Sequence, residues 1–172
     1  MTLINSFTLR PKMEQQQQQQ MMKEKNWAIM DIEYIRTSKS HRCVRKLYIL
    51  GKDGYTDLEL DVYPCVRYKD LEKWYQRAFR FCRNHIHKLE YDPIHKYAPT
   101  CKTVLAKINA FIVYNSIDII LYKGGTIEKE LCSKLCIPSF NIERFPELEK
   151  VQSHDPQTEV NGYYNQLVKF CK

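Results

Sequence analysis

Long apolar runs are missing from this sequence, and so are the glycine and leader motifs that mark several common protein classes. No apolar run reaches the roughly 18 residues of a membrane-spanning helix. The N-terminal stretch MTLINSFTLRPKMEQQQQQQ has neither the apolar core nor the small-residue cleavage site of a secretory signal. Gly124-Gly125 lacks the Gly-Lys-Ser/Thr ending of a nucleotide-binding phosphate loop. We therefore expect an intracellular protein, cytoplasmic or nuclear, with no membrane partner.

Cysteine motifs are also scarce, although cysteine itself is not. The chain has 7 cysteines, an odd number, and no Cys-x-x-C occurs. The nearest pair, Cys132 and Cys136, lies on an expected helix, and a zinc site there would need two more ligands from distant histidines. Reduced, mostly buried thiols are the simpler interpretation.

Length and composition predict one globular domain behind a polar leader. The chain has 172 residues, of which 44% are hydrophobic and 12% aromatic, enough for a packed core. Residues 1–25 include the polyglutamine run 15–20 and show no apolar periodicity, so we expect a disordered leader there and the domain over 26–172. The net charge of +7 favours polyanions such as nucleic acid or an acidic membrane face as partners.

Apolar periodicity predicts an α/β domain. Strands are expected over 27–35, 46–50 and 58–65, as an antiparallel meander with a turn at Lys52-Asp53-Gly54. Apolar residues at helical spacing from Leu71 to Cys82 predict a helix, and a second helix is expected over 103–114. There follow a buried strand over 117–123, a helix over 124–136, a short strand within 139–145 and a helix that begins at Asp155-Pro156.

Two acids interrupt the first strand. Asp31 and Glu33 are two residues apart, so their side chains project from the same face. Apolar residues occupy both faces of this strand, which indicates a central strand covered on both sides. Buried like charges need a compensating partner, and a bound cation is one solution. The alternative is an edge strand whose acids point to solvent.

The pattern of acids resembles the DEDDh 3′→5′ exonucleases of the RNase H-like superfamily. The Asp-x-Glu strand opens a meander, as in the family's first motif. Lys123-Gly124-Gly125-Thr126-Ile127-Glu128 follows a strand and is similar to the second motif, His-Asn-Ala-x-Phe-Asp, with Glu for Asp and Lys-Gly for His-Asn. His154-Asp155-Pro156-Gln157-Thr158-Glu159 is similar to the third, His-x-x-x-x-Asp, again with Glu for Asp.

This resemblance implies a three-layer fold with a mixed central sheet, three antiparallel strands followed by parallel ones, flanked by helices. It also implies a metal-dependent exonuclease, a hydrolase that cleaves phosphodiester bonds. Two divalent ions, Mg²⁺ or Mn²⁺, would bind Asp31, Glu33, Glu128 and Glu159, and His154 would act on the attacking water. His154 could equally be an exposed loop residue. Asp155 is interpreted as a helix cap.

Basic residues cluster after the acidic strand, where they could contact phosphates: Arg36, Lys39, Arg42 and Arg45, with Lys123 near the acids. A solvated loop would carry the same charges. Two further interpretations stay open. One is a catalytically inactive RNase H-like module that binds nucleic acid or a protein. The other is an unrelated basic α/β interaction domain in which Asp31 and Glu33 are incidental.

Overall fold

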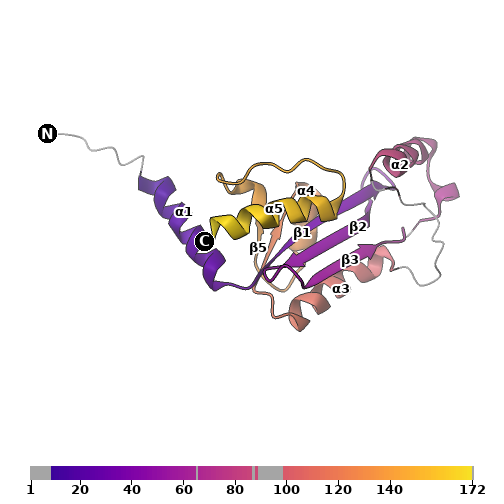
Figure 1. Ribbon diagram of the computed structural model, residues 1–172. Helices are drawn as coiled ribbons and strands as arrows, with labels where there is room; N and C mark the ends of the chain where they lie inside the picture. The colour runs from indigo at the N-terminus through magenta and orange to yellow at the C-terminus, as the bar shows by residue number, and fades with distance from the viewer. Residues whose placement is uncertain (1–8, 65, 87, 89–98, 172) are drawn as a thin grey trace.

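The computed structural model describes residues 9–64, 66–86, 88 and 99–171 (Figure 1). Its strands are β1 (Trp27–Arg36), β2 (Arg42–Gly51), β3 (Asp57–Asp61), β4 (Ile119–Tyr122) and β5 (Ser139–Asn141). Its helices are α1 (Leu9–Glu24), α2 (Lys73–His85), α3 (Cys101–Tyr114), α4 (Thr126–Cys132) and α5 (Pro156–Phe170), with short 3-10 turns η1 (Tyr68–Asp70) and η2 (Ile142–Arg144). From β1 onwards, the predicted order of helices and strands is confirmed.

The five strands form one mixed sheet in the order β3-β2-β1-β4-β5. β1 pairs antiparallel with β2, and β2 antiparallel with β3, as the predicted meander requires. β4 is parallel to β1, with Met30 opposite Tyr122, and β5 is parallel to β4. β1 is therefore the central strand, and its residues 27–32 are all buried.

Helices cover both faces of the sheet. Ala28, Met30 and Ile32 of β1 pack in one core cluster with side chains of α3 and α4. Trp27 and Ile29, which alternate with them, pack in a second cluster with side chains of α5 and η2. Figure 1 shows α5 on one side of the sheet and α3 on the other. Side chains alternate between the two faces of a strand, so Asp31 and Glu33 lie on the same face as Trp27 and Ile29 and project toward α5.

Helix α2 lies at the end of the sheet, where β1 and β2 extend beyond the other strands (Figure 1). Its buried residues Tyr75 and Phe79 pack against Ile35 of β1 and Cys43 of β2. The helix thus closes the core at this end, and on its opposite side Trp74 and Phe81 are exposed.

Before β1, within the segment predicted as a disordered leader, residues 9–24 form helix α1. The middle of this helix is the glutamine run 15–20, and its last turn docks: Met22 is fully buried and the Trp27 indole donates a hydrogen bond to the Met22 carbonyl. The Lys52 ammonium donates to the carbonyls of Met22, Lys23 and Lys25 and so satisfies the C-terminal end of α1. Apolar Met22 and this lysine cap explain the order there.

Smaller differences concern boundaries and cysteines. α4 ends at Cys132, so Cys136 lies outside it, and the five cysteines for which thiols are described are all free. β5 covers only the first residues of the predicted 139–145 segment, and η2 follows it. The strand expected over 58–65 ends at Asp61, and Cys65 lies outside the described residues. In the part of the chain that is described, no helix has the length and apolar character to span a membrane.

Candidate carboxylate site

The site begins with Asp31, near the middle of the central strand. Asp31 is 3% exposed, and its Oδ2 atom has no hydrogen-bond partner among the described residues. Glu33 lies two residues on, on the same face and half-buried, just before a bulge in the pairing of β1 with β2. The alternative of an edge strand with solvated acids is wrong, because β1 is central and covered on both faces.

Glu159 reaches the same place from the first turn of α5. Asp155 caps this helix as predicted: its side chain accepts a hydrogen bond from the Thr158 amide, and Pro156 follows it. Glu159 is fully buried, and its Oε1 accepts a hydrogen bond from the Ser153 amide at 2.7 Å. Its Oε2 forms an ion pair with Lys123. Both oxygens of Glu159 are therefore engaged.

Lys123 brings a positive charge into this group of acids. It directly follows β4, and its amide donates to the Met30 carbonyl, which places Lys123 beside Asp31 on the neighbouring strand. Burial lowers the pKa of Lys123, but the bond to Glu159 and the charge of Asp31 outweigh it, so the net shift is upward. The lysine is thus held protonated among the carboxylates.

Glu128 lies at the edge of the group, in the first turn of α4. It is buried, and its Oε2 accepts a hydrogen bond from the Gly125 amide at 2.8 Å, closing a capping box at its own helix N-terminus. The side chain folds over Gly124, where a Cβ atom would overlap the Glu128 carboxyl. The longer side chain of Glu, compared with Asp, is what lets this carboxylate turn back on its own helix.

Electrostatics confirm that the acids act on one another. Burial, then the charge of Glu159, raises the pKa of Asp31 to about 9, with a smaller contribution from Glu33, while Lys123 opposes the rise. Burial also raises the pKa of Glu33 to about 7, and repulsion from Glu159 and Glu128 adds to it. One lysine does not neutralise this group, so the raised pKa values mean that, without another cation, Asp31 and Glu33 tend to hold protons.

His154 and a pocket lie next to the acids. The His154 Nδ1 atom is 4.0 Å from Glu33 Oε1, and the side chain is 70% exposed. A pocket of about 410 Å³ opens beside them; it is lined by Lys123, Glu143, Lys150, Val151, Gln152, Ser153, His154 and Glu159. Of the predicted catalytic residues, His154 and Glu159 line this pocket, and Asp31, Glu33 and Glu128 are not part of its lining.

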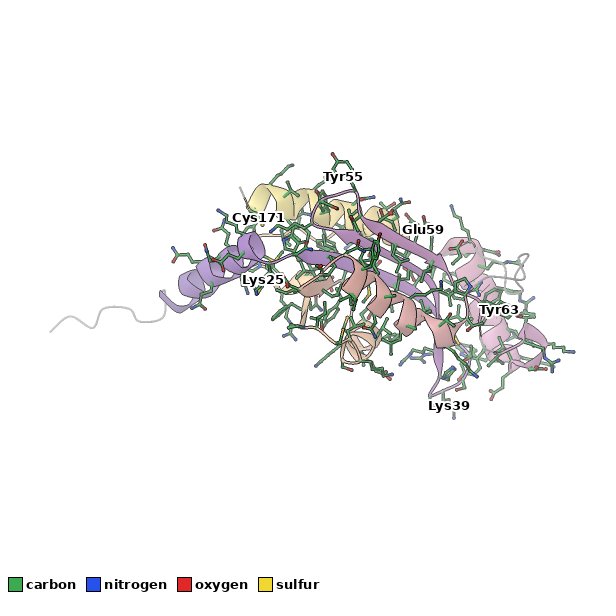
Figure 2. All side chains as sticks on the ribbon, turned by 90° about the horizontal axis from the view of Figure 1, so that it is seen from below. Lys25, Lys39, Tyr55, Glu59, Tyr63 and Cys171 are labelled. Atoms are coloured by element: carbon green, nitrogen blue, oxygen red, sulfur yellow. The ribbon has the colours of Figure 1, made fainter. Side chains whose placement is uncertain are left out.

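The basic residues of the β1–β2 hairpin lie elsewhere. Arg36 and Lys39 are exposed and Arg42 is half-buried, and Lys39 lies at the end of the molecule opposite Cys171 (Figure 2). Arg45 is buried: it donates a hydrogen bond to the Val62 carbonyl at 2.7 Å and lies over the Phe79 ring. Within this predicted set, Lys123 contacts the acids through its ion pair with Glu159.

The sequence alone missed two contributions to this site: the ion pair of Lys123 and the Ser153 amide. The signal for Lys123 was available in principle. The last residue pair between the parallel strands β1 and β4 is Met30 with Tyr122. The next residue on each strand is Asp31 and Lys123, so these two lie side by side. Nothing in the residue types around Ser153 indicates its bond to Glu159.

The arrangement fits a bound divalent ion only in part. Asp31 and Glu33 offer hard carboxylate oxygens of the kind that Mg²⁺ and Mn²⁺ prefer, and the unpartnered Oδ2 atom of Asp31 suits such a ligand. Glu128 and Glu159 instead bind the Gly125 amide, Lys123 and the Ser153 amide. Accordingly, across the described residues no group of three or more His, Cys, Asp or Glu side chains is arranged to hold a metal ion.

Comparison with known proteins adds no relative. No protein-family model matches the chain. No curated protein matches it either. The site is therefore interpreted from its own residues.

Proposed function

We propose that this protein is a divalent-cation-dependent nuclease of RNase H-like fold, a 3′→5′ exonuclease that hydrolyses phosphodiester bonds of RNA or DNA. The observation that carries the proposal is the buried Asp31 carboxylate with an unpartnered oxygen, grouped with Glu33 and Glu159. Burial of acids in this way costs several kcal/mol unless a cation compensates it. A protein that only needed stability would have apolar residues there.

The fold supports the same proposal. An antiparallel meander followed by two parallel strands, with helices on both faces, is the arrangement that the resemblance to DEDDh exonucleases implies. The three motif segments come together although they are far apart in the chain. The net charge of +7 suits a polyanionic substrate.

The chain's own residues have separate tasks in this reaction. Asp31 and Glu33 would hold the cation, which supplies charge stabilisation at the phosphate and makes water a better nucleophile. His154, exposed at the pocket and 4.0 Å from Glu33, accepts the proton of the attacking water. Lys123 and Lys150 line the same pocket and provide positive charge for the phosphate.

The test is an assay of the purified full chain on single-stranded RNA and DNA that carry a 5′ label. With Mg²⁺ or Mn²⁺, we expect a ladder of products shortened from the 3′ end, and no products with chelator. Asp31→Asn abolishes cleavage, while Lys69→Gln, outside the site, leaves it unchanged. A wild-type chain that binds the ion but leaves every substrate intact would refute the nuclease proposal.

One observation favours a second candidate, a catalytically inactive module that binds nucleic acid. The ion pair between Lys123 and Glu159 places a positive charge where a metal-binding carboxylate is needed. The same assay separates the two candidates when binding is measured alongside cleavage. Binding of labelled strands without metal-dependent cleavage supports the inactive module.

A further inference from the structure

Lys123 is placed as a built-in cation of the carboxylate group. Its ammonium contacts Glu159, a residue with no exposed surface, and the charge of Asp31 also acts on it. Lys123 follows β4, and the parallel pairing of β4 with β1 fixes its position beside Asp31. The contact is therefore a consequence of sheet register rather than of a flexible surface side chain finding a partner.

The remaining ligand capacity of the site is small. Glu159 accepts from the Ser153 amide and pairs with Lys123, and Glu128 accepts from the Gly125 amide. Asp31, with its buried Oδ2 that accepts no hydrogen bond, and the half-buried Glu33 have oxygens available for a ligand, and Glu159, whose Oε2 pairs with Lys123, lies next to Asp31. Two carboxylates with water and substrate phosphate are the usual protein environment of a single Mg²⁺.

We propose that the Lys123 ammonium takes the place of one of the two cations that the resemblance implies, so that this site binds a single divalent ion through Asp31 and Glu33. The inference deepens the proposed function and rests on it. It accounts for two features together: Asp31 and Glu33 remain under-compensated with the lysine present, and Glu159 and Glu128 are already bound by Lys123 and by the Ser153 and Gly125 amides.

Charge balance supports one ion. Lysine supplies one positive charge to four carboxylates, and a divalent ion then leaves a single negative charge. The Gly125 amide, at the N-terminus of α4, further stabilises the charge of Glu128. A second divalent ion would have to lie in contact with the Lys123 ammonium. Coulomb repulsion between two cations in contact is large in a partly buried site.

The experiment is calorimetric titration of the metal-free full chain with Mn²⁺, without nucleic acid. We expect wild type to bind one ion per chain. Lys123→Met removes the built-in cation and frees Glu159, so it should bind a second ion, or bind the first at least about tenfold more tightly. Lys69→Met is the matched control, because it removes the same charge from an exposed lysine outside the site, and its titration should equal wild type. Asp31→Asn should bind none.

The outcomes separate this inference from the proposed function. Two ions on the wild-type chain would overturn the role of Lys123 and leave the nuclease proposal standing, as would identical titrations of wild type and Lys123→Met. No ion on either chain would refute the metal-dependent function itself. If Mn²⁺ binds the Lys123→Met variant but not the wild-type chain, the single-ion site is overturned and the inactive module is supported. Circular dichroism checks folding, and Lys123→Gln replaces the Met variant if that one unfolds.

Discussion

Gly124 determines where the Glu128 carboxylate lies. Its φ angle is +121°, in the region that favours glycine, and a Cβ atom there would overlap the Glu128 side chain. At Gly125, by contrast, a Cβ atom would meet nothing within 4 Å. Gly124 is therefore sterically constrained and Gly125 is not, so a substitution at Gly125 is the matched control for one at Gly124.

We therefore expect Gly124→Ala to destabilise the protein by about 1–3 kcal/mol, through backbone strain and loss of the Glu128 cap. Gly125→Ala should change the free energy of unfolding by no more than about 0.5 kcal/mol. Urea unfolding of both variants measures the difference. Equal stabilities would mean that Glu128 does not fold over Gly124 in solution.

Asp31 makes the stability of the metal-free protein depend on pH. Its pKa is about 9 in the folded chain, against an ordinary value of 3.8, so between these values the folded state holds a proton that the unfolded state has lost. Stability therefore decreases as pH rises through this window, and Glu33, with a pKa of about 7, adds to the decrease in its lower part.

Melting temperatures of the chelator-treated protein should accordingly fall from pH 5 to pH 9. Asp31→Asn should flatten this profile, since the amide does not titrate, and should be more stable than wild type at pH 9. Divalent ion should raise the wild-type melting temperature most at high pH, where the carboxylates are charged. A profile that rises with pH would show that the acids are compensated by something other than protons.

At the scale of single elements, α1 is held by its last turn. Met22 has no exposed surface and packs beside Trp27, whereas the neighbouring Lys23 is exposed. We expect Met22→Ala to cost about 2 kcal/mol or more, as for other buried methionines, and Lys23→Ala to have little effect. Thermal unfolding followed by circular dichroism distinguishes them. A silent Met22→Ala would show that the glutamine-rich segment is not docked.

The outer surface of α2 combines aromatic and basic side chains. Trp74 is 70% and Phe81 59% exposed, on one side of the helix, and Lys73, Arg77 and Arg80 lie between and beside them. Exposed aromatics can stack on bases while arginine and lysine contact phosphates. Cys82, on the inner side of α2, experiences the charge of Glu33, so this inner side of the helix lies toward the carboxylate group.

Replacement of Trp74 and Phe81 by Ala should therefore weaken binding of single-stranded oligonucleotides by about 1–3 kcal/mol for each base that loses its stacking partner. Tyr55→Ala is the control, since Tyr55 is 91% exposed in the β2–β3 turn (Figure 2). Anisotropy of a labelled strand, with chelator present to prevent cleavage, gives the affinities. Equal losses in all variants would argue against a specific surface on α2.

At the scale of the whole molecule, periodicity and helix-capping residues were sufficient to predict the element order from β1 to α5. Trp27–Ile35 has apolar residues on both faces, and the structure indeed buries this strand in the centre of the sheet. Asp155-Pro156 marks the start of α5 because a side-chain cap and a proline are both local signals. Such features depend on neighbours in the chain, so the sequence carries them directly.

The site was less predictable, because it depends on contacts between distant segments. The approach of Asp31, Glu33 and Glu159 was expected only from the family resemblance, because element order alone does not fix which side chains meet. The pairing of Lys123 with Glu159 depends on the register between β4 and β1, and the inward turn of Glu128 depends on side-chain length and on Gly124. Local periodicity of the sequence predicts neither the Lys123–Glu159 pair nor the orientation of the Glu128 side chain.

The positions of the two tryptophans give this protein two independent optical reporters. Trp27 is 1% exposed, and its indole is hydrogen-bonded to the last turn of α1 at 2.9 Å, so its emission should be blue-shifted and protected from soluble quenchers. Trp74, on the outer surface of α2, should emit at longer wavelength and be quenched readily. Since the sequence contains 2 tryptophans, one fluorescence spectrum reports separately on the docking of the N-terminal helix and on whatever binds α2.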